Sequence, residues 1–384
     1  MGDVSGTEGG ARLRRAREVR GLTQQQLAGL TGMARQTLSA IESGLSDPSL
    51  RNALALARAL DVAVEELFEP VGSAPSVVVR PVAPLGSQGA RVALALMGDE
   101  FVALPLRGDA VSQAGFLPAS GLAGGDGKVD GARLVEPFGP PRPTLVVAGC
   151  DPALPLLQHP LGLLDPPVAF RWWPCPSRSA LGLAADGRVH VAGTHLRGSD
   201  DHYNTGPAAE LLPQGGEVIG FCAWREGLVL RPGLAGSVSG VGDVAQRGLR
   251  LVNREPGAEA RSVLDRELAA LGIEAGQLPG YDTRATGHLQ VTSAVAAGLA
   301  DAGIASEPAA VAYGLAFIPL ADEHFDLIIP ADQADSPEVQ ALLRVLSSRW
   351  LHDQLASLPG YDPARCGQHI ATLPPARRGA RRTK

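Results

Sequence analysis

The stretch LTQQQLAGLTGMARQTLSAIESG, residues 22–44, has the layout of two short helices joined by a tight turn. Thr23 can cap the first helix, and Gly32 permits the turn because glycine adopts positive φ without a steric penalty. Ala34 opens the second helix, in which Leu38 falls on the inward face. Polar side chains stand at the start of this second helix, the end by which a DNA-reading helix enters the major groove. The stretch therefore predicts a helix-turn-helix.

Residues 12–69 resemble the helix-turn-helix domain of phage repressors and of the repressor-like, XRE-type family of bacterial regulators. The resemblance implies a five-helix, all-α domain in which Gln24 contacts a backbone phosphate and the second helix of the motif reads bases. Arginine can bind guanine and glutamine can bind adenine bidentately, which suits Arg35 and Gln36 to base reading. A helical bundle with an incidental polar face is the alternative. The residues expected to contact DNA are Arg14, Arg15, Thr23, Gln24, Ala34, Arg35, Gln36, Thr37, Ala40 and Ser43.

Arginine is concentrated in the helix that precedes the motif. Such a cluster suits phosphate contacts, which supply affinity without sequence information. The arginines of this cluster are Arg12, Arg14, Arg15, Arg17 and Arg20. The apolar residues expected to form the core of the domain include Leu13, Ala16, Val19, Leu27, Ala28, Leu30, Leu38 and Ile41.

The whole chain has 384 residues and a net charge of -6, which is unusual for a DNA-binding protein. Arginine recurs in the tail ARRGARRTK, whereas the acidic excess lies between the two ends, as in a regulator with a local DNA footprint and a separate sensing body. The 4 cysteines are widely spaced, without a CxxC pair, which suits a reducing compartment and indicates no zinc module. Neither an apolar leader nor a membrane-length apolar run is present in the sequence, so we expect a cytoplasmic protein.

The chain is expected to be multidomain. A hairpin is predicted around Gly98-Asp99, between the apolar runs 91–97 and 100–106. The glycine-rich stretch 121–131 lacks the spacing of a phosphate loop and is interpreted as a loop. The expected parts are a disordered N-terminus (1–11), the helix-turn-helix domain (12–70), a linker with a small β-hairpin (71–142), a ligand-sensing α/β domain (143–372) and a basic disordered tail (373–384).

From residue 143 onward, short apolar segments such as TLVVAG, VAFRWW and FDLIIP alternate with helical segments. This alternation predicts an α/β domain with mainly parallel strands, in which ligands bind beyond the carboxyl ends of the strands. Helices are expected to begin near Cys150, Ser177, Gly257 and Gly287. Helix N-termini present free N–H groups and a positive dipole end, so a small anion is the ligand that this arrangement favours.

Several segments in a fixed order over more than 200 residues resemble the two-lobed, periplasmic-binding-protein-like (type II) domain fused to bacterial helix-turn-helix regulators. They include AGCDPALPLL (148–157), VAGTHLRGSDDHYN (191–204) and LVNREPGAEAR (251–261). The resemblance implies two lobes joined by crossovers near 225–231 and 315–325, and a relation to molybdate and tungstate binding proteins. One departure is Glu259, which occupies a position that is usually glycine.

The ligand-binding residues are expected at the junctions between strands and helices. They are Cys150, Asp151, Ser177, Ser179, His195, Tyr203, Asn204, Arg254, Gly257, Arg261 and His288. Each has an alternative role: the arginines can form structural ion pairs, the serines can cap helices, and Tyr203 and Asn204 can brace a loop. Trp172, Trp173 and Trp224 are expected in the core.

These features predict a ligand-responsive, non-enzymatic transcriptional regulator that binds double-stranded DNA as a homodimer on an inverted repeat. Its ligand is expected to be a small oxyanion such as molybdate or tungstate, or a pterin-type molecule, and no cofactor or metal is expected. Two alternatives remain open. One is a cysteine-dependent enzyme with Cys150 as nucleophile and His195 or His288 as base. The other is a regulator whose C-terminal domain only dimerises, which Glu259 favours.

Overall fold

The computed structural model describes residues 5–68, 76–124, 133–140, 142–198 and 203–375. The chain forms two compact units, Met1–Ser76 and Val77–Lys384. The first is all-α and the second is α/β, which confirms the predicted fold class. No helix in the described part of the chain is long and apolar enough to cross a membrane.

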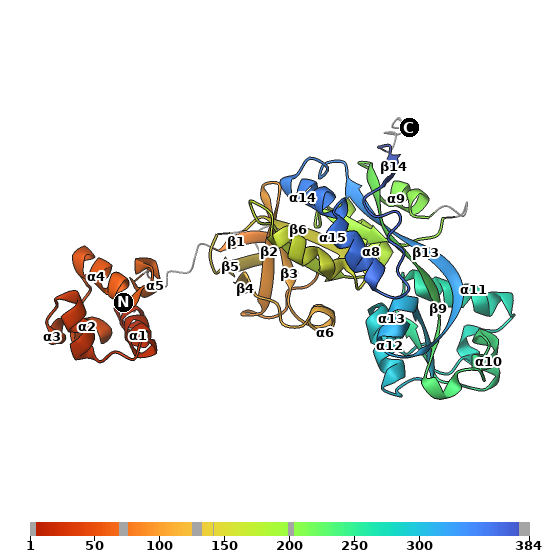
Figure 1. Ribbon diagram of the computed structural model, residues 1–384, viewed down its shortest axis with the longest axis horizontal. Helices are drawn as coiled ribbons and strands as arrows, with labels where there is room; N and C mark the ends of the chain where they lie inside the picture. The colour runs from red at the N-terminus through yellow and green to blue at the C-terminus, as the bar shows by residue number, and fades with distance from the viewer. Residues whose placement is uncertain (1–4, 69–75, 125–132, 141, 199–202, 376–384) are drawn as a thin grey trace, which may run out of the picture. The chain divides into compact units, whose positions relative to one another are not determined.

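The described part of the first unit consists of five short helices around one small core. They are α1 (Ser5–Val19), α2 (Gln24–Thr31), α3 (Arg35–Glu42), α4 (Leu50–Leu60) and α5 (Val64–Phe68) (Figure 1). Thr23 caps α2 in a reciprocal arrangement: its hydroxyl accepts a hydrogen bond from the backbone N–H of Gln26, and the Gln26 side chain accepts one from the backbone N–H of Thr23. Gly32 ends α2 with φ 69°, and Ala34 precedes α3, as the sequence predicted.

Two expectations for this unit are wrong. Residues 5–11, expected to be disordered, belong to α1. Val19 and Leu30, expected in the core, are 79% and 65% exposed. The inward stripe of α1 follows Leu13, Ala16 and Arg17, and that of α2 follows the buried pair Leu27 and Ala28, so Val19 and Leu30 fall outside the helical period.

The second unit begins with a closed barrel of five short strands, not with a linker. Its strands follow the order β1-β3-β2-β4-β5 and enclose a core that includes Val79, Leu94 and Val135. The predicted hairpin is confirmed as the antiparallel pair β2 and β3, with Met97 opposite Glu100. The elements are β1 (Val77–Pro81), β2 (Arg91–Met97), β3 (Glu100–Pro105), α6 (Asp109–Ala114), β4 (Gly121–Ala123) and β5 (Arg133–Pro137).

The remainder of the second unit is built on one large mixed sheet. Its strands are β6 (Thr144–Gly149), β7 (Ala169–Pro174), β8 (Val191–Thr194), β9 (Gly216–Leu230), β10 (Leu251–Arg254), β11 (Arg284–Ala285), β12 (Ala302–Ser306), β13 (Ala316–Pro330) and β14 (His369–Leu373). The order is β11-β10-β12-β9-β13-β8-β6-β7, with β14 paired to β9. The sheet is not mainly parallel: β6, β7 and β8 pair in parallel, as do β10, β11 and β12, but β9 and β13 pair antiparallel with each other and with their neighbours.

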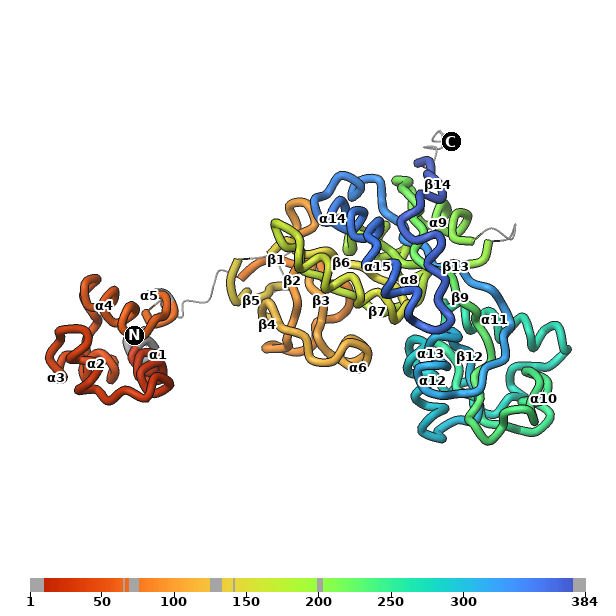
Figure 2. Tube along the Cα trace, in the orientation of Figure 1, coloured from red at the N-terminus to blue at the C-terminus, as the bar shows by residue number. Residues whose placement is uncertain are grey.

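Helices cover the sheet in two groups, which define two lobes (Figures 1 and 2). The first lobe contains η1 (Leu154–Leu157), α7 (Gln158–Gly162), α8 (Ser177–Ala185), α9 (Thr205–Leu211), α14 (Pro337–Leu346) and α15 (Arg349–Ser357). The second contains η2 (Pro232–Leu234), α10 (Val241–Gln246), α11 (Glu259–Ala270), η3 (Ala275–Gln277), α12 (Gly287–Ala296) and α13 (Glu307–Ala312). The helical segment after β13 is interrupted at Ser347 and Ser348, because the Ser348 hydroxyl caps α15 at the backbone N–H of Leu351.

Two long strands, β9 and β13, run through both lobes as the two predicted crossovers. Their antiparallel register extends from Leu230 opposite Ala316 to Gly216 opposite Pro330. The two strands carry runs of polar residues at 225–226 and 322–324. In the structure these polar residues remain within the paired strands. The barrel joins the first lobe, since Ala93 and Leu104 share a core cluster with Val146.

Candidate functional site

The candidate DNA-binding surface lies at the start of α3. Arg35, Gln36 and Thr37 are exposed there, which leaves their side chains available for base contacts. Arg14 and Arg15 are exposed on α1, where Arg14 pairs with Glu18 at 3.0 Å. Their roles as DNA contacts stay predictions. Of the other predicted residues, Thr23 is occupied as a helix cap, and Ser43 donates to the carbonyl oxygen of Ser39 at the end of α3.

Within the arginine cluster of residues 12–20, Arg17 differs from the others because it is buried. Its Nε and Nη2 donate to the two carboxylate oxygens of Glu42 at 2.6 and 3.0 Å, and Nη1 donates to the Leu22 carbonyl at 2.8 Å. Gln24, expected at a phosphate, donates to Glu42 at 2.8 Å. The network joins α1 to the end of α3. Arg17 is therefore part of the domain's interior and not of its phosphate-contacting surface.

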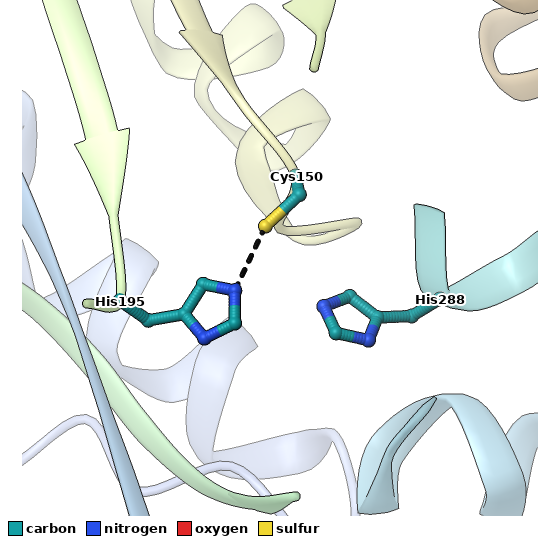
Figure 3. A group of neighbouring side chains, drawn as sticks. All are labelled: Cys150, His195 and His288. Atoms are coloured by element: carbon teal, nitrogen blue, oxygen red, sulfur yellow. Dashed lines mark hydrogen bonds between the residues drawn. The ribbon is translucent and has the colours of Figure 1, made fainter. Parts of the chain in front are cut away.

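A buried cluster of polar side chains lies where the two lobes meet. Cys150 follows β6 and His195 follows β8, so the first lobe supplies both at the carboxyl ends of its strands. The second lobe supplies His288 from the first turn of α12. Figure 3 shows these three side chains pointing toward one another. Their ligand-type atoms all lie within 4.8 Å of one another, although nothing in the sequence spacing indicated a metal site.

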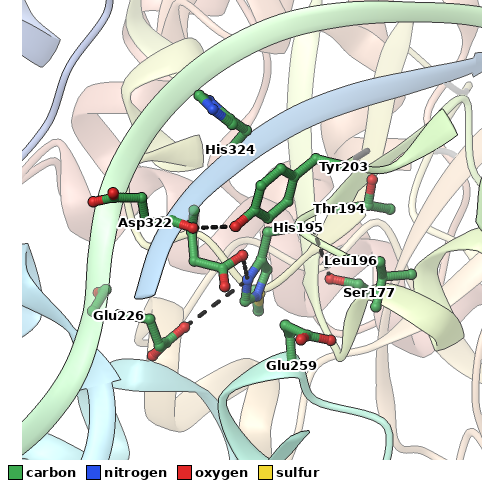
Figure 4. Close-up of polar contacts among 12 residues, drawn as sticks. Ser177, Thr194, His195, Leu196, Tyr203, Glu226, Glu259, Asp322 and His324 are labelled. Carbon is green, nitrogen blue, oxygen red and sulfur yellow. Dashed lines mark hydrogen bonds and ion pairs between the residues drawn. The ribbon is translucent and has the colours of Figure 1, made fainter. Parts of the chain in front are cut away.

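His195 is held on both sides of its ring. Nε2 lies 3.1 Å from Cys150 Sγ (Figure 3). Nδ1 lies 3.4 Å from Glu323 Oε2. It also lies 3.9 Å from Glu226 Oε2 (Figure 4). Burial by itself lowers the pKa of His195, but the neighbouring sulfur and the Glu323 carboxylate raise it well above its usual value. A sulfur, an imidazole and a carboxylate in this order also resemble the arrangement that activates a nucleophile.

His288 presents one ring nitrogen to the cluster and the other to the protein. Nδ1 lies 3.2 Å from the backbone N–H of Ser306, 3.4 Å from Arg254 Nη1 and 3.5 Å from Glu226 Oε1. Among the described residues, Nε2 has no hydrogen-bond partner. Burial, followed by the charges of Arg254 and His195, lowers the pKa of His288 well below its usual value, which keeps the ring neutral.

Carboxylates from the two crossover strands complete the cluster. Glu226 on β9 and Glu323 on β13 are 0% and 1% exposed. Neither Glu226 oxygen nor Glu323 Oε1 has a hydrogen-bond partner within the part of the chain that the structure describes. Burial raises the pKa of Glu226 to about 8, with Glu323 adding to the effect and His195 opposing it. Unpartnered buried oxygens are costly, so these atoms indicate a place for a ligand or ion.

Arg254, the expected source of positive charge, is already neutralised. Its Nε and Nη2 donate to the Glu255 carboxylate at 2.8 and 2.9 Å. Glu255 also accepts from the backbone N–H of Gly287, so a carboxylate of the protein occupies the start of α12. Glu259 is paired with Arg266 at 2.8 Å. A free anion therefore meets less positive charge here than the sequence suggested.

The remaining predicted ligand residues lie beside the cluster or away from it. Asp151 accepts from Tyr361 and from the backbone N–H of Ala153, and Ser177 accepts from the backbone N–H of His195 at 3.2 Å. The others have structural or exposed positions: Asn204 bonds Thr194 and Asp326, Tyr203 donates to the Asp322 carbonyl, Arg261 stacks on Tyr281, and Ser179 and Gly257 are exposed.

Sequence reasoning missed Glu226, Glu323 and Ser306, whereas Trp224 lies in the core as expected and also borders the cluster. Ser306 Oγ and Trp224 Nε1 are buried and unpartnered among the described residues, and the Trp224 ring lies 5.4 Å from that of His195. A partial signal was available, since Glu226 and Glu323 each lie in a short run of polar residues at a predicted crossover. Successive side chains of a strand point to opposite faces, so the sequence did not show which member of each run lies in the cluster.

Comparisons with known proteins agree with this division of the chain. Residues 161–347 match a family described as PBP superfamily domain, and residues 13–67 match one described as Helix-turn-helix. The chain is 27% identical over 237 residues to the uncharacterized protein YvgK of Bacillus subtilis, which covers 61% of this chain and 75% of that protein. It is 42% identical over 57 residues, 15% of this chain and 86% of the relative, to an uncharacterized HTH-type transcriptional regulator of Methanocaldococcus jannaschii.

A solved structure with a similar fold is a Clostridium perfringens protein described as a phosphate ABC transporter substrate-binding protein, determined with bound phosphate. The TM-score is 0.45 and the identity 11%, over 57% of this chain and 99% of that chain.

Proposed function

Because the chain belongs to the HTH-type transcriptional regulators, and because its helix-turn-helix domain is followed by a PBP superfamily domain, we propose that it regulates transcription in response to a small ligand. In this proposal α3 reads the operator, and the ligand enters the buried cluster between the two lobes. The protein acts as a homodimer on an inverted repeat, since one small helix-turn-helix covers too few base pairs for useful specificity.

One observation carries the ligand-binding half of the proposal. Both lobes and both crossover strands place buried polar atoms in the same cluster, and six of these atoms are unpartnered within the described residues: His288 Nε2, Ser306 Oγ, Trp224 Nε1, Glu323 Oε1 and the two Glu226 oxygens. Protein interiors satisfy most buried polar groups. A ligand that supplied their partners would contact the second lobe and both crossover strands beside the first-lobe residues Cys150 and His195, which favours the closed arrangement over an open one.

The ligand class proposed is a small oxyanion, with molybdate and tungstate as the first candidates. Support comes from possible donors in the cluster: the Trp224 indole N–H, the Ser306 hydroxyl and His288 Nε2. The pairing of Arg254 with Glu255 means that the anion needs a further positive charge to offset the nearby carboxylates. Sulfate and phosphate are the controls because they are tetrahedral but smaller.

The test has two stages, both with the full chain. Selection from random-sequence DNA first identifies the operator, and DNA-binding affinity is then measured with molybdate, tungstate, sulfate, phosphate and a pterin. A ligand that binds only the folded protein also raises the melting temperature in proportion to ln(1 + [L]/Kd). We expect one ligand to change operator affinity by at least about 5-fold, the lower end of typical allosteric coupling.

Two variants separate the halves of the proposal. Arg35→Ala is expected to lose operator preference and keep ligand binding, whereas Ser306→Ala is expected to weaken ligand binding and keep operator binding without ligand. Ser347→Ala, at an exposed serine, is the control for Ser306→Ala. A chain that binds operator identically with every ligand, and whose melting temperature none of them moves, would refute ligand response. It would support the alternative in which the second unit only dimerises.

A cysteine-dependent enzyme is the second candidate, favoured by the contacts of His195 with Cys150 and Glu323. Intact-mass analysis with ester and thioester probes distinguishes the two. A covalent adduct on Cys150, absent from Cys150→Ala, supports an enzyme. An unmodified chain together with a ligand-dependent change in operator affinity supports the regulator.

A further inference from the structure

The buried cluster has a feature that a bare oxyanion site does not need: one sulfur and two imidazoles gathered from both lobes. Cys150 Sγ and His195 Nε2 are 3.1 Å apart, and all three ligand atoms, with His288 included, lie within 4.8 Å. In a tetrahedral zinc site, bonds of about 2.3 Å to sulfur and 2.0–2.1 Å to nitrogen place neighbouring ligand atoms roughly 3.3–3.6 Å apart. The first pair is close to that spacing already.

We propose that Cys150, His195 and His288 bind a divalent late transition-metal ion of the Zn²⁺ type. A thiolate with two imidazoles suits zinc, cobalt or nickel, whereas calcium and magnesium require oxygen ligands in greater number. All three residues are buried, at 4%, 1% and 1% exposure, so the bound ion is shielded from solvent. Three protein ligands leave a fourth position open, as in zinc sites that exchange water for another ligand.

The surroundings of His195 match those of a metal-bound histidine. A metal-ligating imidazole normally directs its other nitrogen to a carboxylate or carbonyl, which fixes the ring and strengthens the bond to the metal. His195 meets this requirement, since Nδ1 lies 3.4 Å from Glu323 Oε2 while Nε2 faces Cys150. Without metal, Nε2 and Cys150 Sγ share one hydrogen bond, and therefore one proton, across 3.1 Å. Metal binding replaces that proton.

Metal binding requires a larger change at His288 than at His195, because His288 belongs to the second lobe and its ring must move toward the two ligands of the first lobe. Nε2 faces the cluster without a partner among the described residues (Figure 3). Its Nδ1 is close enough to accept from the N–H of Ser306, at 3.2 Å, and a metal on Nε2 requires the proton on Nδ1 instead. Glu226 Oε1, 3.5 Å from Nδ1 and unpartnered in the described chain, is positioned to accept a hydrogen bond from the protonated Nδ1. Metal binding thus replaces the bond from the Ser306 N–H by one to Glu226, and it brings His288 closer to the two ligands of the first lobe.

The metal would also provide the positive charge that an oxyanion needs. Arg254 is neutralised by Glu255, whereas a divalent ion held by one thiolate keeps a net positive charge toward its open position. This inference concerns the cluster used by the proposed function, and it can fail while ligand response stands. Zinc binding is measured without an oxyanion, and ligand response is measured by operator affinity.

The experiment uses the full chain after treatment with a chelator. One equivalent of Co²⁺ is expected to give the visible bands of tetrahedral cobalt and a near-ultraviolet sulfur-to-cobalt charge-transfer band, and Zn²⁺ is expected to remove both. X-ray absorption of the zinc form should show one sulfur at about 2.3 Å and nitrogen ligands at about 2.0 Å. This measurement on the unmodified chain keeps the test decisive even where a variant folds poorly.

Variants assign the ligands. Cys150→Ser should lose the charge-transfer band, and His288→Gln should weaken zinc binding by more than about 100-fold, beyond the 10–100-fold typical of changes to residues that only support a ligand, such as Glu323→Gln. Cys366→Ser is the matched control, since Cys366 is a buried cysteine whose sulfur contacts the Leu346 carbonyl outside the cluster. The proposal is overturned if the unmodified chain binds no stoichiometric zinc in competition with a chelator. It is also overturned if the charge-transfer band survives in Cys150→Ser.

Discussion

Removing the Glu42 carboxylate tests whether Arg17 holds the helix-turn-helix unit together. In Glu42→Ala the Arg17 guanidinium loses two hydrogen bonds of 2.6 and 3.0 Å while its side chain stays only 9% exposed. Breaking one side of a buried ion pair costs about 3–5 kcal/mol. We expect the lower end, about 3 kcal/mol, because Arg17 still donates to the Leu22 carbonyl. A unit of this size is stable by roughly 4–10 kcal/mol, so the loss is large.

The two units of the chain can be followed separately in one urea titration. All 4 tryptophans lie beyond residue 76, so tryptophan fluorescence reports the second unit alone, whereas far-ultraviolet circular dichroism reports both. With an m-value of about 1 kcal/mol/M, Glu42→Ala should lower the midpoint of the helical unit by about 3 M and leave the fluorescence transition unchanged.

A double variant, Arg17→Met with Glu42→Leu, provides the control. Replacing both partners of a buried pair by apolar residues is often neutral or stabilising, so most of the lost stability should return. Its DNA binding should keep the salt dependence of the unmodified chain, because Arg17 is not a phosphate contact. A loss below 1 kcal/mol in Glu42→Ala, or a flattened salt slope in the double variant, would refute the reasoning.

Three further predictions concern DNA binding, assembly and pH. Arg35→Ala should cost about 1–3 kcal/mol on the operator and relax preference at one base pair, while Arg14→Ala should weaken all DNA binding and reduce the salt slope by about 1; equal losses of Arg35→Ala on operator and random DNA would contradict this. Footprinting should show two half-sites about 10 base pairs apart, and sedimentation should show a dimer; a monomer on one half-site would count against it. Burial lowers the pKa of His190 to about 4, below its unfolded value near 6.5. The contribution of the neutral His190 ring to the free energy of unfolding is therefore fully present above pH 6.5, and about 3 kcal/mol of it is lost as the pH falls toward 4. Unfolding free energies of His190→Gln should fall less over this range, and an unchanged slope would exclude His190 as the cause.

Sequence reasoning predicted the elements that local chemistry determines. Thr23 and Gly32 fix the limits of α2 by capping and by positive φ, and the apolar run 144–149 forms the buried strand β6. The barrel was missed because β1, β4 and β5 are short, and their pairing joins residues such as Val79 and Arg133 that are distant in the chain. The residues of each short segment do not indicate which other strand it pairs with.

The candidate site was predicted in part for the same reason. Cys150, His195 and His288 follow strands or begin helices, a position visible in the sequence. Glu226 and Glu323 were missed because each lies in a short run of polar residues between apolar segments. Such a run is typical of a loop, although here the strand continues through it. The neutralisation of Arg254 by its neighbour Glu255 depends on side-chain direction, which residue spacing does not encode.

The two long strands that join the lobes have a mechanical consequence. Two separate loops would form a hinge with little resistance to bending. The strands β9 and β13 are instead hydrogen-bonded to each other along their length, so the lobes can separate only if this paired segment bends. Its register shifts lie between Pro319 and Ala321 and between Phe325 and Asp326, one on each side of Glu323. Bulges of this kind bend the strand that contains them. Closure of the lobes on a ligand, as proposed, would therefore bend this pair of strands at two points that flank Glu323.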